Sequence, residues 1–123
     1  MKLETLQPDL TVCKVPDFKD INTDGDFFFI AKTDRETSLV CPTEYAPLNC
    51  TERNDGWKGF RIKGSLDFSL IGVLSDISGV LTENGISIFA VSTYDTDYIL
   101  VKKECFGRAL DVLEKKGFET ING

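Results

Sequence analysis

Polar side chains crowd a short connection in the second half of the chain, between two apolar runs. Ser92 to Asp97 reads Ser-Thr-Tyr-Asp-Thr-Asp, and apolar, β-branched runs precede and follow it. Its carboxylates and hydroxyls are acceptors for an ammonium group. A second segment, Asp67 to Gly72, opens a helical pattern, and the unpaired N–H groups of a helix start attract anions. The two segments together could hold both charged groups of a small zwitterion.

Individual roles follow from this chemistry. Backbone amides at the helix start are expected to bind a carboxylate, and Gly72 would let a ligand approach the backbone closely. Asp97 is the strongest candidate for the ammonium, with Asp95 second. Plainer explanations stay open, because Asp is common in turns and Asp or Ser often caps a helix. The candidate ligand-binding residues are Asp67, Phe68, Ser69, Leu70, Ile71, Gly72, Ser92, Thr93, Tyr94, Asp95, Thr96 and Asp97.

Composition argues against several other classes of function. The 123 residues include no histidine, and the four cysteines form no C-x-x-C motif. No catalytic residue, metal site or cofactor is therefore expected. A net charge of −6 opposes binding to nucleic acid, and no run approaches the roughly 18 apolar residues of a membrane span. The N-terminus lacks an apolar signal segment, which predicts a cytoplasmic protein.

Two further patterns in the first half of the chain have structural explanations. Asp20 to Phe27 places Asp, Asn, Asp and Gly as a calcium-binding loop does, but Ala31 stands where that loop needs Glu. A polar turn is the better interpretation. Cys13 and Cys41 lie in apolar runs and are expected to be buried free thiols; a disulfide is the less favoured alternative.

The second half of the chain predicts a β-α-β-β-α-β order. Phe60–Lys63 alternates like a strand, and Leu70, Leu74, Ile77 and Leu81 form one face of a helix that Asn84-Gly85 ends. Two strands with a hairpin loop follow. A second helix then runs through Phe106, Leu110 and Leu113, and Phe118–Ile121 is a last strand. This is the ferredoxin-like arrangement, with both helices on one face of the sheet.

The first half is less regular. Strands are predicted at Leu10–Val15, Phe27–Ala31 and Ser38–Cys41, the middle one buried on both faces. A helical turn is predicted within Thr43–Leu48, and Asn54-Asp55-Gly56 indicates a turn and domain boundary. Residues 28–44 also align without a gap on residues 88–104 at an offset of 60. We therefore expect two tandem copies, 1–56 and 57–123, with the first one degenerate and its first helix mostly lost.

These residues resemble a known family. Residues 57–64, 66–74 and 86–101 are similar to the ACT-domain family, including regulatory ACT units of aspartate kinases and animal arginine-sensing proteins. The resemblance implies an α+β fold of ferredoxin-like units and an amino acid or similar metabolite bound where two ACT units meet. It also implies pairing of ACT sheets, as in a homodimer. Many ACT units have a glycine before the first helix, whereas Gly72 is expected inside that helix.

Two functions remain open on this basis. The first is a non-catalytic regulatory module that binds an amino acid between Asp67–Gly72 and Ser92–Asp97. The alternative is a protein-interaction or oligomerisation domain that has lost ligand binding. An enzyme is the least favoured class, because no nucleophile motif or phosphate loop is present.

Overall fold

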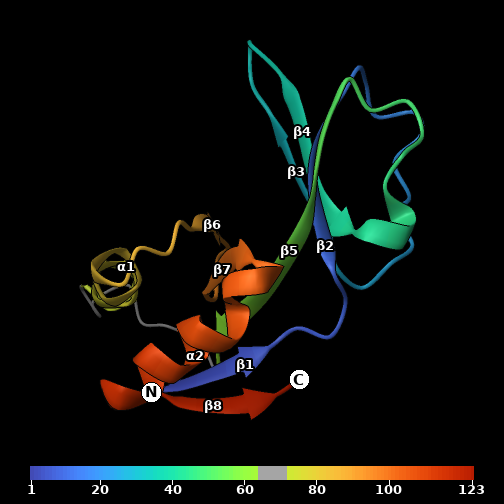
Figure 1. Cartoon of the computed structure of the whole chain (residues 1–123). Coiled ribbons are helices and arrows are strands. Elements are labelled where there is room, and N and C mark those ends of the chain that lie inside the picture. Colours follow the sequence, from blue (N-terminus) through green and yellow to red (C-terminus); the bar gives the residue numbers. More distant parts are fainter. Residues whose placement is uncertain (64–71) are drawn as a thin grey trace. The chain divides into compact units, whose positions relative to one another are not determined.

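The computed structural model describes residues 1–63 and 72–123, and within them the chain forms two compact units (Figure 1). The larger unit comprises Met1–Gln7 and Lys58–Gly123. The smaller unit is the continuous segment Pro8–Trp57. The expected boundary between residues 56 and 57 lies next to one of these divisions. The expectation differs from the structure in residues 1–7, which belong with the C-terminal part of the chain.

The larger unit has the predicted order of elements. A strand leads to a helix, two strands of a hairpin, a second helix and a last strand. In chain order these are β5 (Glu52–Ile62), α1 (Val73–Glu83), β6 (Phe89–Ser92), β7 (Asp97–Lys102), the 3₁₀ turn η2 (Lys103–Cys105), α2 (Phe106–Lys115) and β8 (Glu119–Asn122). In the sheet β7 lies between β5 and β6. The β-α-β-β-α-β prediction is confirmed.

The sheet of the larger unit contains one strand that the sequence did not predict. This strand, β1 (Lys2–Thr5), lies between β5 and β8. It runs antiparallel to β5, with Leu3 opposite Ile62, and parallel to β8, with Leu3 opposite Thr120. The chain's first residues therefore separate two strands that would otherwise be neighbours, which is why they belong to this unit.

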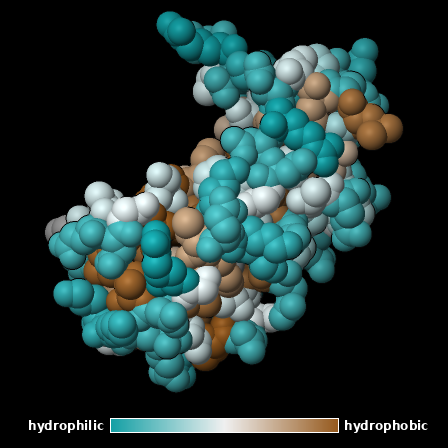
Figure 2. Space-filling view, in the orientation of Figure 1, coloured by the Kyte–Doolittle hydropathy of each residue, from teal (hydrophilic) through white to brown (hydrophobic). Residues whose placement is uncertain are grey.

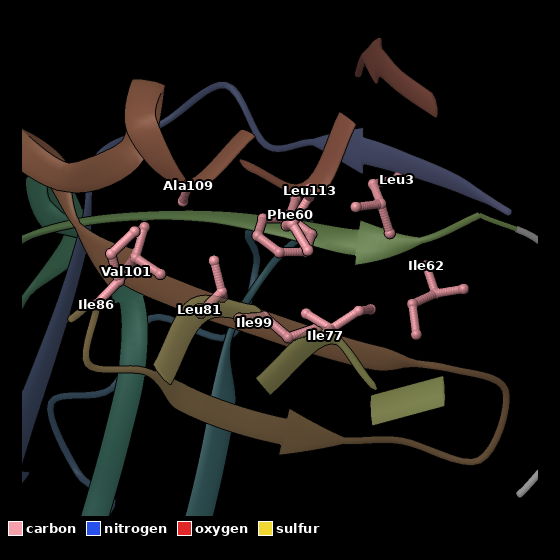
Figure 3. Close-up of a cluster of buried hydrophobic side chains, with 10 residues drawn as sticks. All are labelled: Leu3, Phe60, Ile62, Ile77, Leu81, Ile86, Ile99, Val101, Ala109 and Leu113. Carbon is pink, nitrogen blue, oxygen red and sulfur yellow. The ribbon is translucent and has the colours of Figure 1, made fainter. Parts of the chain in front are cut away.

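Both helices of the larger unit pack on the same side of its sheet (Figure 3). Ile77 and Leu81 of α1 and Leu113 of α2 are fully buried against strand residues such as Phe60 and Ile99. The spacing of the α1 residues is the predicted helical stripe. The buried core of this unit consists of Leu3, Phe60, Ile62, Ile77, Leu81, Ile86, Ile99, Val101, Ala109 and Leu113.

The helices end as the sequence indicates. The residue after Asn84 is Gly85, which has φ +72°, and the amide of Ile86 donates to the carbonyl of Leu81. After α2, Gly117 has φ +99° and the amide of Phe118 donates to the carbonyl of Leu113. A left-handed glycine at this position is the usual way to satisfy the last carbonyls of a helix.

The smaller unit is built on strands. Leu10–Val15 forms β2, and β3 (Phe29–Lys32) and β4 (Thr37–Pro42) form a hairpin. The 3₁₀ turn η1 (Thr43–Tyr45) follows, and β2 pairs with both β4 and the first part of β5. Within Pro8–Trp57, all of which the structure describes, η1 is the only helix, and Phe18–Ile21 makes a single turn.

The prediction that Phe27–Ala31 is buried on both faces is wrong. The strand begins at Phe29 and pairs with β4 alone among the described strands, so it lies at an edge of the sheet. Ile30 is 37% exposed and Ala31 is also exposed. Phe27 and Phe29 instead pack edge to face, with ring centroids 5.2 Å apart. An apolar run does not by itself distinguish a central strand from an edge strand.

Asn54-Asp55-Gly56 is not a turn. The three residues lie inside β5. Leu10 of β2 lies opposite Trp57 and Val12 opposite Asn54, so β5 has one residue more than β2 between these two pairs. This extra residue is a β-bulge, and Gly56 has φ +83°, which suits a glycine at such a position. Turns and bulges use the same residue types, which explains the error.

Connecting segments, and not helices, cover one face of the smaller unit's sheet. The sequence predicted that the first copy had lost most of its first helix. Cys13, Val15, Leu39 and Cys41 are buried on this face. Side chains from loops pack against them, namely Ile21, Phe28, Ala46 and Cys50. Asn22 Oδ1 accepts a hydrogen bond from the amide of Asp24, so the Asp20–Phe27 segment contains the predicted polar turn. The expected burial of the Cys13 and Cys41 thiols is confirmed.

The two hairpins repeat at an offset of 60 residues. Strands β3 and β4 and the turn η1 have bounds that are each 60 lower than those of β6, β7 and η2. The pairing register is also the same, with Phe29 opposite Val40 and Phe89 opposite Leu100. The amides of Thr33 and Thr93 donate to the carbonyls of Glu36 and Thr96, at 2.9 and 2.8 Å. The sequence alignment therefore corresponds to equal local structures.

Candidate functional site

The candidate site was predicted from two segments, and the structure describes one of them fully. Ser92–Asp97, the hairpin loop, joins β6 to β7. Of the other segment, only Gly72 lies within the described residues. The remaining predicted site residues, Asp67, Phe68, Ser69, Leu70 and Ile71, lie outside them.

Gly72 stands at the start of α1 and not inside it, contrary to the expectation. It is the N-cap residue with φ +92°, and its carbonyl accepts a hydrogen bond from the amide of Asp76 at 2.7 Å. A glycine thus precedes the first helix, as in many ACT units. The N–H groups of the first turn belong to residues from Val73 onward, which moves the predicted anion-attracting end of the helix a few residues along the chain.

The hairpin loop is held in shape by its two threonines. The Thr93 hydroxyl donates to the carbonyl of Thr96 at 3.1 Å and accepts from the amide of Thr96 at 3.3 Å. This pattern is a local turn that uses the side chain as well as the backbone. The loop therefore has a fixed backbone on which Tyr94 and Asp95 are both exposed, Tyr94 by 83%.

Thr96 fastens this loop to the neighbouring strand. Its side chain is 9% exposed, and its hydroxyl donates to the carbonyl of Ile62 at 2.7 Å in a buried hydrogen bond. Ile62 is the last residue of β5, the strand after which the chain proceeds toward Gly72 and α1. The structure thereby brings the hairpin loop to the strand end that precedes the other predicted segment. The Thr96 hydroxyl proton is used in this anchor.

Asp97 is oriented by its cross-strand neighbour. It is the first residue of β7, lies opposite Ser92, and accepts a hydrogen bond from the Ser92 hydroxyl at 2.5 Å. The carboxylate is half-buried, which leaves an oxygen able to accept a further hydrogen bond. Strand pairing was the basis for choosing Asp97, and the structure shows that pairing.

A charged cluster beside the loop was not predicted. It consists of Glu4, Arg61, Lys63 and Tyr98, and we call it the sheet-face cluster. Arg61 donates from Nε to Glu4 Oε1 at 2.7 Å and from Nη1 to the Tyr98 hydroxyl at 3.3 Å. Lys63 Nζ lies 3.4 Å from Glu4 Oε2. Because Phe60 and Ile62 face the helices, Arg61 points to the opposite face of the sheet.

The ion pairs of this cluster shift the acidity of its members. The hydrogen bond from Arg61 is the main reason that the pKa of Glu4 is lowered from its ordinary value, with Lys63 contributing in the same direction. Tyr98 and Glu4 raise the pKa of Arg61. The sequence carried no clear signal for this cluster, because recognising it requires the pairing of β1 with β5 across 57 residues.

A shallow depression lies beside the start of α1. Its volume is about 270 Å³, and it is lined by Val73 and Asp76 of α1 together with Met1 and the Lys116–Phe118 turn. Figure 2 shows apolar surface over α1 within an otherwise mainly hydrophilic view. The depression does not include the hairpin loop, so it is separate from the predicted site.

Comparisons with known proteins agree with this architecture. A sequence profile described as "ACT domain" matches residues 52–115. This chain belongs to the ACT-domain family. The resemblance drawn from the sequence is confirmed, and the α+β fold described above is an ACT-like fold.

Named relatives include the human protein called "Cytosolic arginine sensor for mTORC1 subunit 1". It is 30% identical to this ACT protein over 84 residues, which cover 68% of this chain and 25% of the sensor. The bovine sensor matches to the same extent. The chain therefore spans only about a quarter of the length of the curated relatives that it matches.

Solved structures with similar folds include an Agrobacterium tumefaciens protein with a TM-score of 0.88. That protein is 28% identical, and the match covers 99% of this chain and 92% of that one. The regulatory subunit of aspartate kinase from Thermus thermophilus has a TM-score of 0.63 at 10% identity, covering 92% and 95% of the two chains. The latter similarity concerns the fold alone. Among the described residues of this ACT protein, no helix is long and apolar enough to cross a membrane.

Proposed function

We propose that this ACT protein is a non-catalytic regulatory module that binds an amino acid between the segment 67–72 and the hairpin loop. The observation that supports this most directly is the buried hydrogen bond from Thr96 to Ile62, 2.7 Å long. It fixes the loop beside the strand end from which the chain continues to Gly72 and α1. The similarity to an arginine sensor adds support for an amino acid as the ligand class.

The proposed contacts divide the ligand between the two segments. The helix start attracts the ligand carboxylate, and Gly72 leaves room for its backbone because no side-chain atom stands there. Asp97, held by Ser92, accepts from the ligand ammonium, with Thr93 and Asp95 alongside and Tyr94 over the ligand side chain. Asp67, Phe68, Ser69, Leu70 and Ile71 complete the proposed site.

A panel of the twenty amino acids tests this proposal by thermal unfolding of the full chain. A ligand at a hundred times its dissociation constant adds about 2.7 kcal/mol to the free energy of unfolding. We expect at least one amino acid to raise the melting temperature, and Asp97→Asn to abolish that increase. Asp34→Asn is the matched control, because Asp34 is exposed in the equivalent hairpin of the smaller unit. No shift with any amino acid would favour the interaction domain instead.

We further propose that the chain consists of two tandem ACT units, the first of them degenerate. The hairpins that repeat at an offset of 60 support this arrangement, and the smaller unit has loops where the larger has helices. The smaller unit then has no ligand site of its own. Calorimetric titration with an amino acid found in the panel should give one site per chain; two equal sites would contradict the degeneracy.

Pairing between copies of the chain is the last part of the proposal. Among the described strands of the larger unit, β6 and β8 each pair with a single strand of that unit, so each has an edge at which another sheet could add. Association as a homodimer would follow from side-by-side pairing of such edges. Light scattering during size-exclusion chromatography should give twice the chain mass, and a monomer mass would reject this part alone.

A further inference from the structure

Two large apolar side chains of the smaller unit stand in solvent close to each other in sequence. Tyr45, the last residue of η1, is 44% exposed, and Leu48, in the segment between η1 and β5, is fully exposed. Single exposed apolar side chains are common on protein surfaces, whereas neighbouring ones beside a groove often mark a binding site. Neither residue belongs to the proposed ligand site, which lies in the larger unit.

Tyr45 and Leu48 border a groove of about 500 Å³, which we call the loop groove. One wall comes from the segment before β3 and the other from η1 and the segment that follows it. The Asn49 side-chain amide donates to Asp20 Oδ2 at 3.0 Å and so joins the two walls. The residues that shape the groove include Asp20, Asn22, Glu44, Tyr45, Pro47 and Leu48.

Buried residues hold both walls in place. Ile21 from the first wall and Ala46 from the second pack against the buried apolar cluster of the smaller unit. The Cys50 thiol donates to the carbonyl of Pro47 at 2.9 Å, which closes the turn that carries Leu48. The exposure of Leu48 is therefore a property of an anchored turn. A groove that is already formed loses little conformational entropy when it binds a partner.

The charges that line the groove have one sign. Asp20 and Glu44 are its charged residues, and both are acidic. Within the part of the chain that the structure describes, the Glu44 carboxylate has no hydrogen-bond or ion-pair partner. The segment 17–26, which supplies the first wall, contains four aspartates and a single lysine. This charge repels phosphates and anionic membranes and attracts lysine and arginine side chains.

We propose that the loop groove binds a segment of a partner protein in which an apolar side chain is flanked by lysine or arginine. The apolar side chain packs against Tyr45 and Leu48, and the flanking cations face Glu44 and Asp20. A cation without an apolar group would leave Leu48 in water, which is why the chemistry favours a peptide segment. The proposal does not depend on the amino-acid site, so the two can fail separately.

Fluorescence anisotropy of a labelled synthetic peptide tests the proposal on the full chain. The peptide carries a leucine with lysines on both sides, and it should bind saturably. One control peptide has serine in place of the leucine, and another has glutamates in place of the lysines. Each should bind at least about tenfold more weakly, because burial of a leucine is worth that factor or more and like charges repel. Equal binding of the leucine and serine peptides, or no saturable binding of the leucine peptide, would overturn the proposal.

Variants of the protein locate the binding surface. Leu48→Ser should weaken binding of the leucine peptide by about tenfold and Glu44→Gln by about threefold. Ile30→Ser and Asp34→Asn are the matched controls, because both residues are exposed in the smaller unit and neither lines the groove. They should leave the affinity unchanged. Since Leu48 is fully exposed, Leu48→Ser should melt at the wild-type temperature, and a folded Leu48→Ser protein with wild-type affinity would overturn the proposal.

Discussion

The hairpins β3–β4 and β6–β7 have the same strand bounds and register at an offset of 60. The elements that pack against the two hairpins differ. Two helices cover the sheet of the larger unit, and ten buried apolar residues form its core. Loops cover the sheet of the smaller unit, whose buried cluster has four members, two of them cysteines. A repeated hairpin therefore fixes local geometry only; what packs behind it differs between the two units.

A second difference concerns the hairpin loops. Thr96 is buried and hydrogen-bonded to Ile62, whereas the residue 60 positions earlier is Glu36, which is exposed. Both loops share the backbone hydrogen bond at Thr33 and Thr93. The loop of the larger unit is thus anchored to a neighbouring strand by a side chain, and the loop of the smaller unit is not anchored in this way.

Matched truncations in the two cores should show the largest effect. Leu113→Ala and Leu39→Ala both remove a buried leucine, 0% and 1% exposed. Such changes cost about 2–5 kcal/mol, and the cost depends on how far the surroundings collapse into the cavity. Leu113 lies in the ten-residue core that the sheet and both helices enclose, which leaves little room to relax, so Leu113→Ala should lie near the upper end and Leu39→Ala near the lower end. Urea denaturation measures the loss of stability in each variant. Equal losses would contradict the contrast between a core covered by helices and a core covered by loops.

Removing the anchor of the hairpin loop should have the next largest effect. Thr96→Val leaves the buried carbonyl of Ile62 without its donor, which costs about 1–3 kcal/mol. Thr96→Ser keeps the hydroxyl and should recover most of that loss. Glu36→Ala, at the equivalent exposed position, should change stability by less than about 0.5 kcal/mol. Thermal unfolding of the three variants measures these changes in stability. A large effect of Glu36→Ala would show that the two loops are anchored alike.

Left-handed glycines provide a smaller contrast. Gly56 in the bulge of β5 and Gly72 before α1 both have positive φ, and a Cβ at either would meet no atom within 4 Å. Alanine at either position should therefore cost about 1–2 kcal/mol of conformational strain, without a steric clash. Gly79 lies inside α1 with the same open space, and Gly79→Ala should add about 0.5–1 kcal/mol. The melting temperature should fall for Gly56→Ala and Gly72→Ala and rise for Gly79→Ala. A stabilising Gly72→Ala would show that Gly72 does not start the helix.

The larger unit could be predicted from sequence because its signals are local. The spacing of Leu74, Ile77 and Leu81 indicates a helix whatever lies around it, and Asn84-Gly85 ends it. Local signals were not sufficient for the smaller unit, because the composition of Phe27–Ala31 fits a central strand and an edge strand equally well. The strand β1 has only Leu3 as a buried side chain and no pattern of its own.

The candidate site likewise combines a local feature that the sequence predicted with long-range contacts that it did not. Turn residues at Tyr94–Asp97 predicted the hairpin loop, which the structure places one residue earlier, at residues 93–96 between β6 and β7. The anchor from Thr96 to Ile62 joins residues 34 positions apart, and the pair of Glu4 and Arg61 joins residues 57 apart. Contacts of this kind depend on the register between strands, which a single sequence does not specify.

Charge pairs give the smallest expected difference between the units. Glu4 and Arg61 join β1 to β5 in the larger unit, whereas Arg53 and Asp55 of the smaller unit lie in one strand, with Nε–Oδ1 at 2.9 Å. The Arg61 hydrogen bond lowers the pKa of Glu4 in the folded protein below its ordinary value of 4.5. The unfolded chain then binds more protons than the folded chain as acid is added. The stabilisation is complete above the ordinary value and is lost as pH falls through the lowered one.

Glu4→Gln tests this dependence. The variant should unfold at lower urea than the wild type at neutral pH, and the difference should shrink as the pH falls below about 4.5, the ordinary pKa of a glutamate. Lys63→Met removes the weaker partner of Glu4 and should change the pH profile less, because the Arg61 bond is the main cause of the shift. A gap between wild type and Glu4→Gln that stays constant in acid would mean that Glu4 contributes through packing of β1 and not through its charge.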